Sequence, residues 1–235
     1  VRFIHRRIDG QIVLADNLRP LFSWILPEEK IFTVPNGLDI PDPGHRPGPG
    51  PLRVLYLSNY IRSKGVMEVL EAARILESKG SVATFRLAGG WNERDTEKEV
   101  RAFLQAHPGL HIELSGPVSG AEKDLLLREA DVFVLPTWYA NEGLPWALIE
   151  AMAHRLPLLS TRHAAVPSCL EEGVNGFFVE KHDADSLAEA LERFVREPGL
   201  AKRLGDASRE RYERSFTGEA MIRGLKEAFI KTIKA

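Results

Sequence analysis

The sequence has one cysteine, no long apolar run and almost no net charge. Cys169 stands alone among 235 residues, so it cannot form an intramolecular disulfide or supply a zinc-finger type of metal site. No apolar run approaches the ~18 residues that span a bilayer, and no signal-peptide pattern opens the sequence. Lys plus Arg number 31 against 33 Asp plus Glu, a formal net charge of −2, which removes any global electrostatic argument for nucleic acid or an anionic membrane. We therefore expect a cytoplasmic protein with no nucleic-acid partner.

A segment rich in proline and glycine divides the chain. Residues 41–51, PDPGHRPGPGP, cannot sustain helix or ladder hydrogen bonds, so we predict a linker there. Residues 1–40 read as a helix end, a strand at 12–15, a short helix at 17–26 and a second strand leading to VPNGLD at 34–39. This stretch is too short for a domain, and we predict that it is the tail of a truncated N-terminal α/β domain.

Beyond the linker, short apolar runs alternate with amphipathic stretches. The first such stretch repeats apolar residues every three or four positions from Val66 to Leu76, which is typical of a helix with one buried face. Continuous apolar strands alternating with such helices predict an α/β fold, a doubly wound parallel sheet, over residues 52–216, followed by a C-terminal helix over 217–235. The expected strands are 54–58, 83–88, 110–114, 131–136, 156–160 and 176–180.

The segment NEGLPWALIEAMAH, residues 141–154, places two glutamates around a helix that is apolar on nearly every side. Ligands of a doubly wound sheet bind at the carboxyl ends of its strands, and Glu142 follows one of these strands. Glu150 lies within the apolar helix, where a carboxylate without a partner is costly. We predict that Glu150 has no partner within the chain and binds a ligand. The alternatives are that Glu150 extends past small residues to water and that Glu142 only complements the helix dipole.

Three further segments follow strands at the same expected edge. Arg62 and Lys64 in SNYIRSKG (58–65) are cations on a strand-to-helix loop, which suits a diphosphate, although both could be solvated loop charges. Gly143 and Leu144 can offer free backbone N–H groups at the positive end of a helix. Gly89 in LAGGW either lets a ligand approach the backbone or only makes a turn.

Two patterns that suggest metal ligands have simpler interpretations. Asp183 and Asp185 form a D-x-D, but they open a helical stretch, where Asp is the expected cap. His107 and His111 are four apart, yet Pro108 between them breaks the helix that ligation at this spacing needs. We predict no metal site.

Together these motifs make the chain resemble the C-terminal half of the family 4-type retaining glycosyltransferases with two Rossmann-like domains, also called glycosyl transferases group 1. The resemblance extends over nearly the whole chain. It rests on an ordered set of motifs: VPNGLD, SKG, LAGG, the E-x7-E of Glu142 and Glu150, and EEGVNGFFV followed by DADSLAEAL.

The resemblance implies roles for the residues that match the family's motifs. Glu150 would hold the ribose hydroxyls of a nucleotide, Glu142 would contact hydroxyls of the donor sugar, and Lys64 would neutralise the diphosphate leaving group. The backbone N–H groups of Gly143 and Leu144 would face sugar and phosphate.

The resemblance also marks the base site and three departures from the family pattern. The backbone of Val118, after the third strand, would read the base. Most relatives have Arg where Asn59 stands, so either Arg62 substitutes for it or the phosphate site is weaker. Pro145 replaces a frequent Gly and has no N–H to give, and Ser168 replaces a common Glu.

The function implied is that of a retaining, metal-independent hexosyltransferase without a cofactor. It would transfer a sugar from a nucleotide-diphosphate sugar to a carbohydrate or lipid-linked acceptor in polysaccharide or glycolipid biosynthesis. This chain would be mainly the donor-binding half, inactive alone, and the missing N-terminal domain would carry the acceptor site and any peripheral association with the inner face of the membrane. The alternative is a non-catalytic nucleotide-binding module. A dinucleotide oxidoreductase would need a GxGxxG fingerprint, which the first strand lacks.

Overall fold

The computed structural model describes residues 8–44 and 50–234 and contains a parallel sheet of six strands. The strand order is β5-β4-β3-β6-β7-β8, and every neighbouring pair is parallel. The doubly wound sheet is therefore confirmed, and each predicted strand lies within two residues of its observed position. The strands are β3 (Leu52–Leu57), β4 (Ala83–Ala88), β5 (Ile112–Ser115), β6 (Val132–Leu135), β7 (Leu158–Thr161) and β8 (Gly176–Val179).

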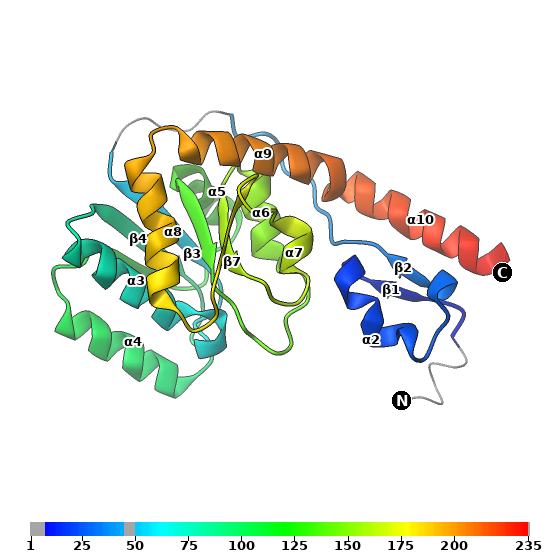
Figure 1. Ribbon diagram of the computed structural model, residues 1–235, viewed down its shortest axis with the longest axis horizontal. Helices are drawn as coiled ribbons and strands as arrows, with labels where there is room; N and C mark the ends of the chain where they lie inside the picture. Colours follow the sequence, from blue (N-terminus) through cyan, green and yellow to red (C-terminus); the bar gives the residue numbers. More distant parts are fainter. Residues whose placement is uncertain (1–7, 45–49, 235) are drawn as a thin grey trace.

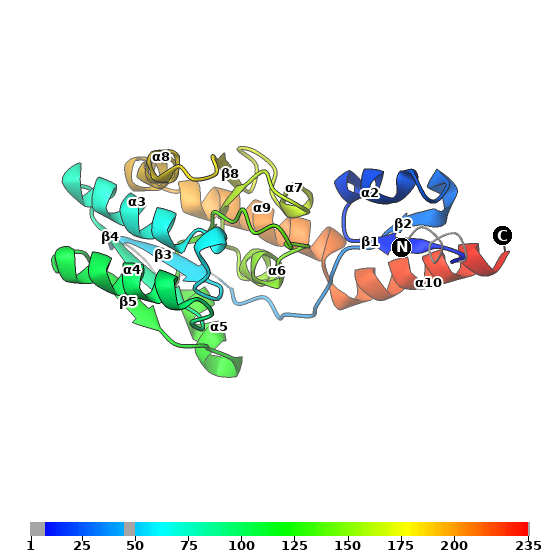
Figure 2. The same cartoon turned by 90° about the horizontal axis from the view of Figure 1, so that it is seen from below.

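Helices cover both faces of this sheet, as buried apolar strands require. In Figures 1 and 2, α3 (Val66–Ser78), α4 (Arg94–Ala106) and α8 (Ala184–Arg196) lie on one face, and α5 (Gly120–Glu129) and α6 (Trp146–Ala153) lie on the other. The short α7 (Val166–Cys169) follows β7, and α9 (Leu200–Ser215) packs on α6.

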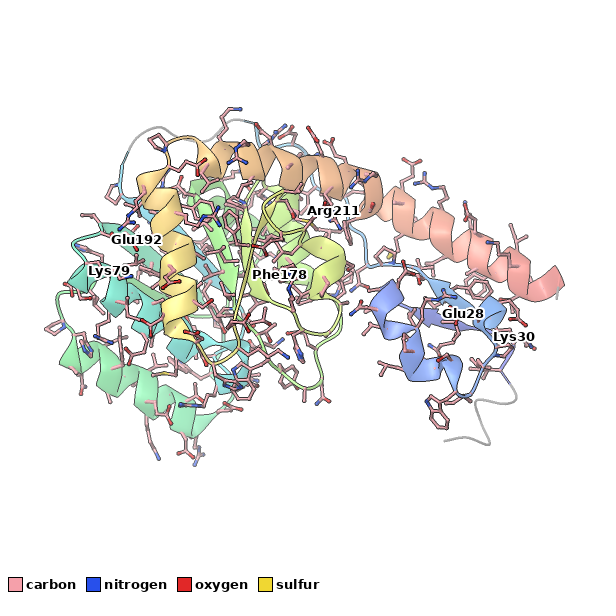
Figure 3. All side chains as sticks on the ribbon, viewed as in Figure 1. Glu28, Lys30, Lys79, Phe178, Glu192 and Arg211 are labelled. Atoms are coloured by element: carbon pink, nitrogen blue, oxygen red, sulfur yellow. The ribbon has the colours of Figure 1, made fainter. Side chains whose placement is uncertain are left out.

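Helices α3 and α8 pack against each other along much of their length. Apolar residues on one side of α3 are fully buried, among them Val69 and Leu70, as the sequence periodicity predicts. A polar contact closes one end of this interface, where Lys79 Nζ lies 3.4 Å from Glu192 Oε2; Figure 3 shows the two side chains facing each other. The packing fixes α3, whose first turn begins at the end of the loop after β3.

The N-terminal region forms a small sheet of its own. Strands β1 (Gln11–Val13) and β2 (Ile31–Thr33) pair in parallel around a separate apolar cluster of Val13, Leu26 and Ile31. The single helix predicted over 17–26 is wrong: the structure has a 3-10 turn at Asp16–Leu18 and a one-turn helix α2 (Pro20–Ser23), because Pro20 has no N–H for a continuous helix. A second 3-10 turn, Glu28–Lys30, precedes β2. The helix end expected before residue 8 lies outside the described residues.

The C-terminal helix α10 (Gly218–Lys234) lies along the small N-terminal sheet and not over the six-stranded one (Figures 1 and 2). Its first N–H group, from Gly218, donates to Asp39 Oδ1 at 2.9 Å. A methyl group added at Gly224 would lie 3.1 Å from Val34, so the helix closely approaches the residue that follows β2. Within residues 8–44 and 50–234, no helix has the length and apolar character needed to cross a membrane.

Strand order reverses between β3 and β6. From β3 the chain continues to β4 and β5 on one side, and then returns to place β6 on the other side of β3. In doubly wound sheets the loops leaving such a pair of strands part in opposite directions and open a crevice at their carboxyl ends. The loops after Leu57 and Leu135 border this crevice.

Candidate functional site

The loops after β3 and β6 are bonded to each other beside the reversal point. The N–H of Trp138 donates to the carbonyl oxygen of Ser63 at 2.8 Å. Gly65 has a φ of +83°, and a Cβ atom there would lie 2.5 Å from the carbonyl oxygen of Pro136. Position 65 therefore requires glycine on two counts, the left-handed backbone and the close approach of the second loop.

Lys64 and Glu142 meet across these two loops. Lys64 Nζ donates to Glu142 Oε2 at 2.6 Å, and the hydroxyl of Thr137 donates to the same oxygen at 3.0 Å. The side chains are only 15% and 7% exposed, and Lys64 Nζ also lies 4.8 Å from the centre of the Tyr139 ring. The predicted cation and carboxylate are thus brought together as an ion pair whose charges balance without a ligand.

Glu150 does have a partner in the chain, so the prediction that it has none is wrong. Its Oε1 accepts a short hydrogen bond from Nζ of Lys123, which lies on α5, and the exposed fractions are 15% for Glu150 and 31% for Lys123. The neighbours Ile149 and Ala151 on α6 are fully buried. Sequence reasoning missed Lys123 because the partner comes from another helix, 27 positions away.

A second contact joins α5 to His154, the residue that follows α6. His154 Nε2 lies 2.9 Å from Asp124 Oδ1, and His154 Nδ1 lies 2.8 Å from the carbonyl oxygen of Glu150. Hydrogen bonds from Arg128 and from His154 lower the pKa of the Asp124 carboxyl group. The ionised carboxylate of Asp124 therefore links α5 to the end of α6.

Three backbone N–H groups of the predicted site have no hydrogen-bond acceptor within the described residues. Those of Gly143, Leu144 and Val118 donate to no group of residues 8–44 and 50–234. Leu144 is otherwise fixed, since its carbonyl oxygen accepts from Asn36 Nδ2 at 3.2 Å, and Leu14 lies against Gly143. The N-terminal region thus supports the loop before α6, a contact that sequence reasoning did not predict.

The other predicted residues lie nearby with different partners. The half-exposed Arg62 side chain is bonded to Glu99 of α4 and not to the Lys64–Glu142 pair. Asn59 Oδ1 accepts from the N–H of Gly90 at 3.3 Å. A Cβ atom at Gly89 would overlap the carbonyl oxygen of Ser58, so the close approach at this glycine is to the protein backbone.

Two buried polar atoms beside the crevice have no hydrogen-bond partner among the residues that the structure describes, Glu68 Oε2 and Trp138 Nε1. Glu68 lies in the first turn of α3, and the Trp138 ring packs against that of His182 with 4.2 Å between centres. Buried polar atoms normally have a partner, so water or a ligand group would be accommodated here.

The residues that suggested metal ligands have other roles. Asp183 Oδ1 accepts from the N–H of Ser186 at 2.9 Å, which confirms the predicted helix cap. His107 Nδ1 lies 2.9 Å from the carbonyl oxygen of Phe103. In the part of the chain that the structure describes, no group of three His, Cys, Asp or Glu side chains could hold a metal ion. Cys169 is fully buried, which raises its pKa to about 12 and leaves the thiol unreactive.

A hollow that contains none of these residues lies elsewhere. It measures about 760 Å³ and is lined by the first residues of β3, β4 and β5 and by the end of α5. None of the candidate residues lines it. Because ligands of doubly wound sheets bind at the carboxyl ends of the strands, we assign the candidate site to the crevice and not to this hollow.

The sequence model of the glycosyl transferases group 1 family matches residues 43–211. The chain belongs to this family. One curated relative is WcaL of Salmonella typhimurium, a candidate glycosyltransferase of colanic acid biosynthesis, which is 32% identical over 216 residues, 87% of this chain and 52% of its own length. Another is the amylovoran biosynthesis glycosyltransferase AmsK of Erwinia amylovora, 32% identical over 183 residues, 75% of this chain and 44% of its own.

The fold also matches solved glycosyltransferase structures. HepE of Anabaena in complex with UDP and glucose superposes with a TM-score of 0.82 at 16% identity, over 97% of this chain and 65% of that one. At this identity the match shows the fold alone, that of a Rossmann-like domain. The chain spans about half the length of the curated relatives it matches.

Proposed function

We propose that this chain is the donor-binding half of a retaining, metal-independent glycosyltransferase that uses a nucleotide-diphosphate sugar. The observation that carries the proposal is the Lys64–Glu142 pair at the reversal point of the sheet, with Lys64 Nζ 2.6 Å from Glu142 Oε2. This is where doubly wound sheets bind nucleotides, and both residues lie within the segment that the sequence model of the glycosyl transferases group 1 family matches.

Lys64 would bind the diphosphate. Its ammonium group has three donors, of which Glu142 takes one, and the unpaired N–H groups of Gly143 and Leu144 lie in the loop that carries Glu142. When the bond between sugar and phosphate breaks, negative charge grows on the leaving diphosphate, and a cation already in place stabilises it. A fixed ammonium group can do the work that a metal ion does in other transferases, which supports the proposal of a metal-independent reaction.

The two glutamates would bind hydroxyl groups at different parts of the donor. Glu142 would accept hydrogen bonds from the sugar, and Glu150 from the ribose, since carboxylate oxygens form strong bonds with hydroxyl donors. The HepE structure contains UDP and glucose, which makes UDP the reasonable first probe for this chain. Retention of the anomeric configuration is proposed from the family resemblance alone.

The proposed product is a bacterial polysaccharide or glycolipid. The relatives WcaL and AmsK are named for colanic acid and amylovoran biosynthesis, which supports a carbohydrate or lipid-linked acceptor. The acceptor would lie between this chain and a second domain. The facing surfaces of the two domains would exclude water and orient the acceptor hydroxyl.

Titration calorimetry with UDP tests the proposal directly. We expect saturable binding of UDP to the 235-residue chain, with the same affinity in buffer that contains EDTA. Added Mg²⁺ should leave the affinity unchanged as well. Absence of saturable UDP binding, with GDP and ADP also inactive, would contradict donor binding, and loss of binding in EDTA would contradict the metal-independent site.

A further inference from the structure

Glu150 is held by a single side chain. Lys123 donates to its Oε1, while Oε2 accepts no hydrogen bond from any group of the described residues. The apolar neighbours on α6, Ile149 and Ala151, offer no polar group to the carboxylate. Within the described chain, the direction of this carboxylate is therefore set by Lys123.

Lys123 in turn belongs to a helix with one buried side chain. Of the residues of α5, only Leu127 is buried, and the hollow of about 760 Å³ lies beside the end of the helix. Two polar contacts join α5 to α6, the one from Lys123 to Glu150 and the one between Asp124 and His154. The loop that leads into α5 contains Val118, whose backbone is expected to read the base.

We propose that Lys123 is a positioning residue for nucleotide recognition: it holds one oxygen of Glu150 so that the other faces a ribose hydroxyl. This inference rests on the proposed function. A carboxylate that rotates freely loses entropy when it binds a hydroxyl, whereas one already fixed by a charge-assisted bond binds without that cost. Lys123 would act through Glu150 and need not touch the nucleotide.

The test compares UDP with 2′,3′-dideoxy-UDP, which lacks both ribose hydroxyls. For the unmodified chain we expect UDP to bind about tenfold more tightly or better, as a hydrogen bond to a charged group contributes. In Lys123→Met the affinity for UDP should fall by about the same factor while that for dideoxy-UDP stays constant, so the ratio of the two dissociation constants approaches one. Lys123→Arg should restore part of this ratio, because a guanidinium group can still donate to Glu150.

Asp124→Ala is the matched control. It breaks the other bond between α5 and α6 but leaves the contact between Lys123 and Glu150 in place. We expect it to lower the thermal stability of the chain without changing the ratio between UDP and dideoxy-UDP. The ratio does not depend on the fraction of folded protein, so it remains meaningful for a destabilised variant.

Two results would overturn the inference and leave the proposed function standing. One is an unchanged ratio in Lys123→Met although the unmodified chain discriminates between the two ligands. The other is an equal loss of the ratio in Lys123→Met and Asp124→Ala, which would mean that Lys123 only holds α5. If the unmodified chain binds no nucleoside diphosphate at all, the proposed function itself fails, and the inference fails with it.

Discussion

Lys64 and Lys123 each bind a glutamate at the carboxyl edge of the sheet, but their surroundings differ. Lys64 lies on a loop that is bonded through its backbone to the loop carrying Glu142, and the Thr137 hydroxyl donates to the same carboxylate. Lys123 is twice as exposed, and it reaches Glu150 from a helix with one buried side chain. The Lys64–Glu142 pair lies between two loops that are bonded to each other, and the Lys123–Glu150 pair joins two helices.

This difference predicts two kinds of recognition in one crevice. The Lys64–Glu142 pair lies between two bonded loops, which suits the diphosphate. The Lys123–Glu150 pair joins α6 to the helix that follows the loop of Val118, which suits the nucleoside part of the ligand, the ribose with its base. Substitutions that loosen either side should therefore have different consequences for stability and for binding.

We expect the largest loss of stability where the contact between the loops after β3 and β6 is disrupted. In Gly65→Ala the new Cβ would lie 2.5 Å from the Pro136 carbonyl oxygen, in a backbone with a φ of +83°. Strain and displacement together should lower the free energy of unfolding by about 2–4 kcal/mol, as measured by denaturant titration.

Gly80→Ala separates these two causes. Gly80 has a similar φ of +74°, but no atom lies within 4 Å of the position of a new Cβ. It should lower the free energy of unfolding by only about 1–2 kcal/mol, the cost of a left-handed backbone. Equal losses of unfolding free energy in the two variants would show that the contact between the two loops adds nothing to stability.

The next effect concerns the bridge between helices. Glu150→Ala removes the carboxylate proposed to bind ribose, and affinity for UDP should fall by about 1.5–3 kcal/mol, the contribution of a hydrogen bond to a charged group. Calorimetric titration measures this change in UDP affinity. The control substitution Glu122→Ala, on the exposed side of α5, should change the affinity for UDP by almost nothing. Unchanged UDP affinity in Glu150→Ala would remove Glu150 from the site.

A smaller effect distinguishes the two cations of the loop after β3. The guanidinium group of Arg62 is half-exposed and bonded to Glu99, so its charge is partly balanced within the chain and screened by solvent. We predict that Arg62→Ala weakens UDP binding by at most ~1 kcal/mol, the upper value for exposed ion pairs. A larger loss would show that Arg62 takes the place of the arginine that position 59 lacks.

An ion pair outside the crevice, between Asp42 and Arg155, shows how much stability an exposed pair without a ligand contributes. Asp42, in the predicted linker, is bonded to Arg155, and this hydrogen bond lowers the pKa of the Asp42 carboxyl group. A lowered pKa in the folded state contributes stability above the ordinary aspartate value of about 4, and this contribution is lost as the pH falls toward the folded-state value. Asp42→Asn should therefore lower stability by ~0.2–1 kcal/mol at pH 7, and the difference should shrink below about pH 4. A difference that grows in acid would contradict this assignment.

Much of the fold could be predicted from local patterns. Buried parallel strands such as β6 are apolar at every position, and Asp183 opens its helix as a local cap, so neighbouring residues suffice to predict both. The helix over 17–26 was predicted against a local signal, since Pro20 interrupts it. The position of α10 on the N-terminal strands depends on distant contacts such as that of Gly218 with Asp39, which no local pattern indicates.

The sequence predicted most of the individual site residues, but not which side chains bond to each other. Glu142 and Lys64 could be assigned to one edge because both follow strands, yet their bond joins residues 78 positions apart and follows from the strand order. Lys123 was missed altogether. Its one local signal is weak: it lies near the positive end of α5, where a helix dipole does not favour a cation.

Lys64 tests the central claim most directly, namely that the crevice at the strand reversal binds the diphosphate of a nucleotide. The measurement compares the affinities of UDP and uridine, by ligand-observed NMR, for the unmodified chain, for Glu142→Gln and for the double variant Lys64→Met with Glu142→Gln. The double variant leaves no unpaired charge in the partly buried position, so its fold should be retained. We predict that, relative to Glu142→Gln, it binds UDP about ten- to a hundredfold more weakly and binds uridine equally well. Equal losses for UDP and uridine, or no loss for UDP, would contradict the account.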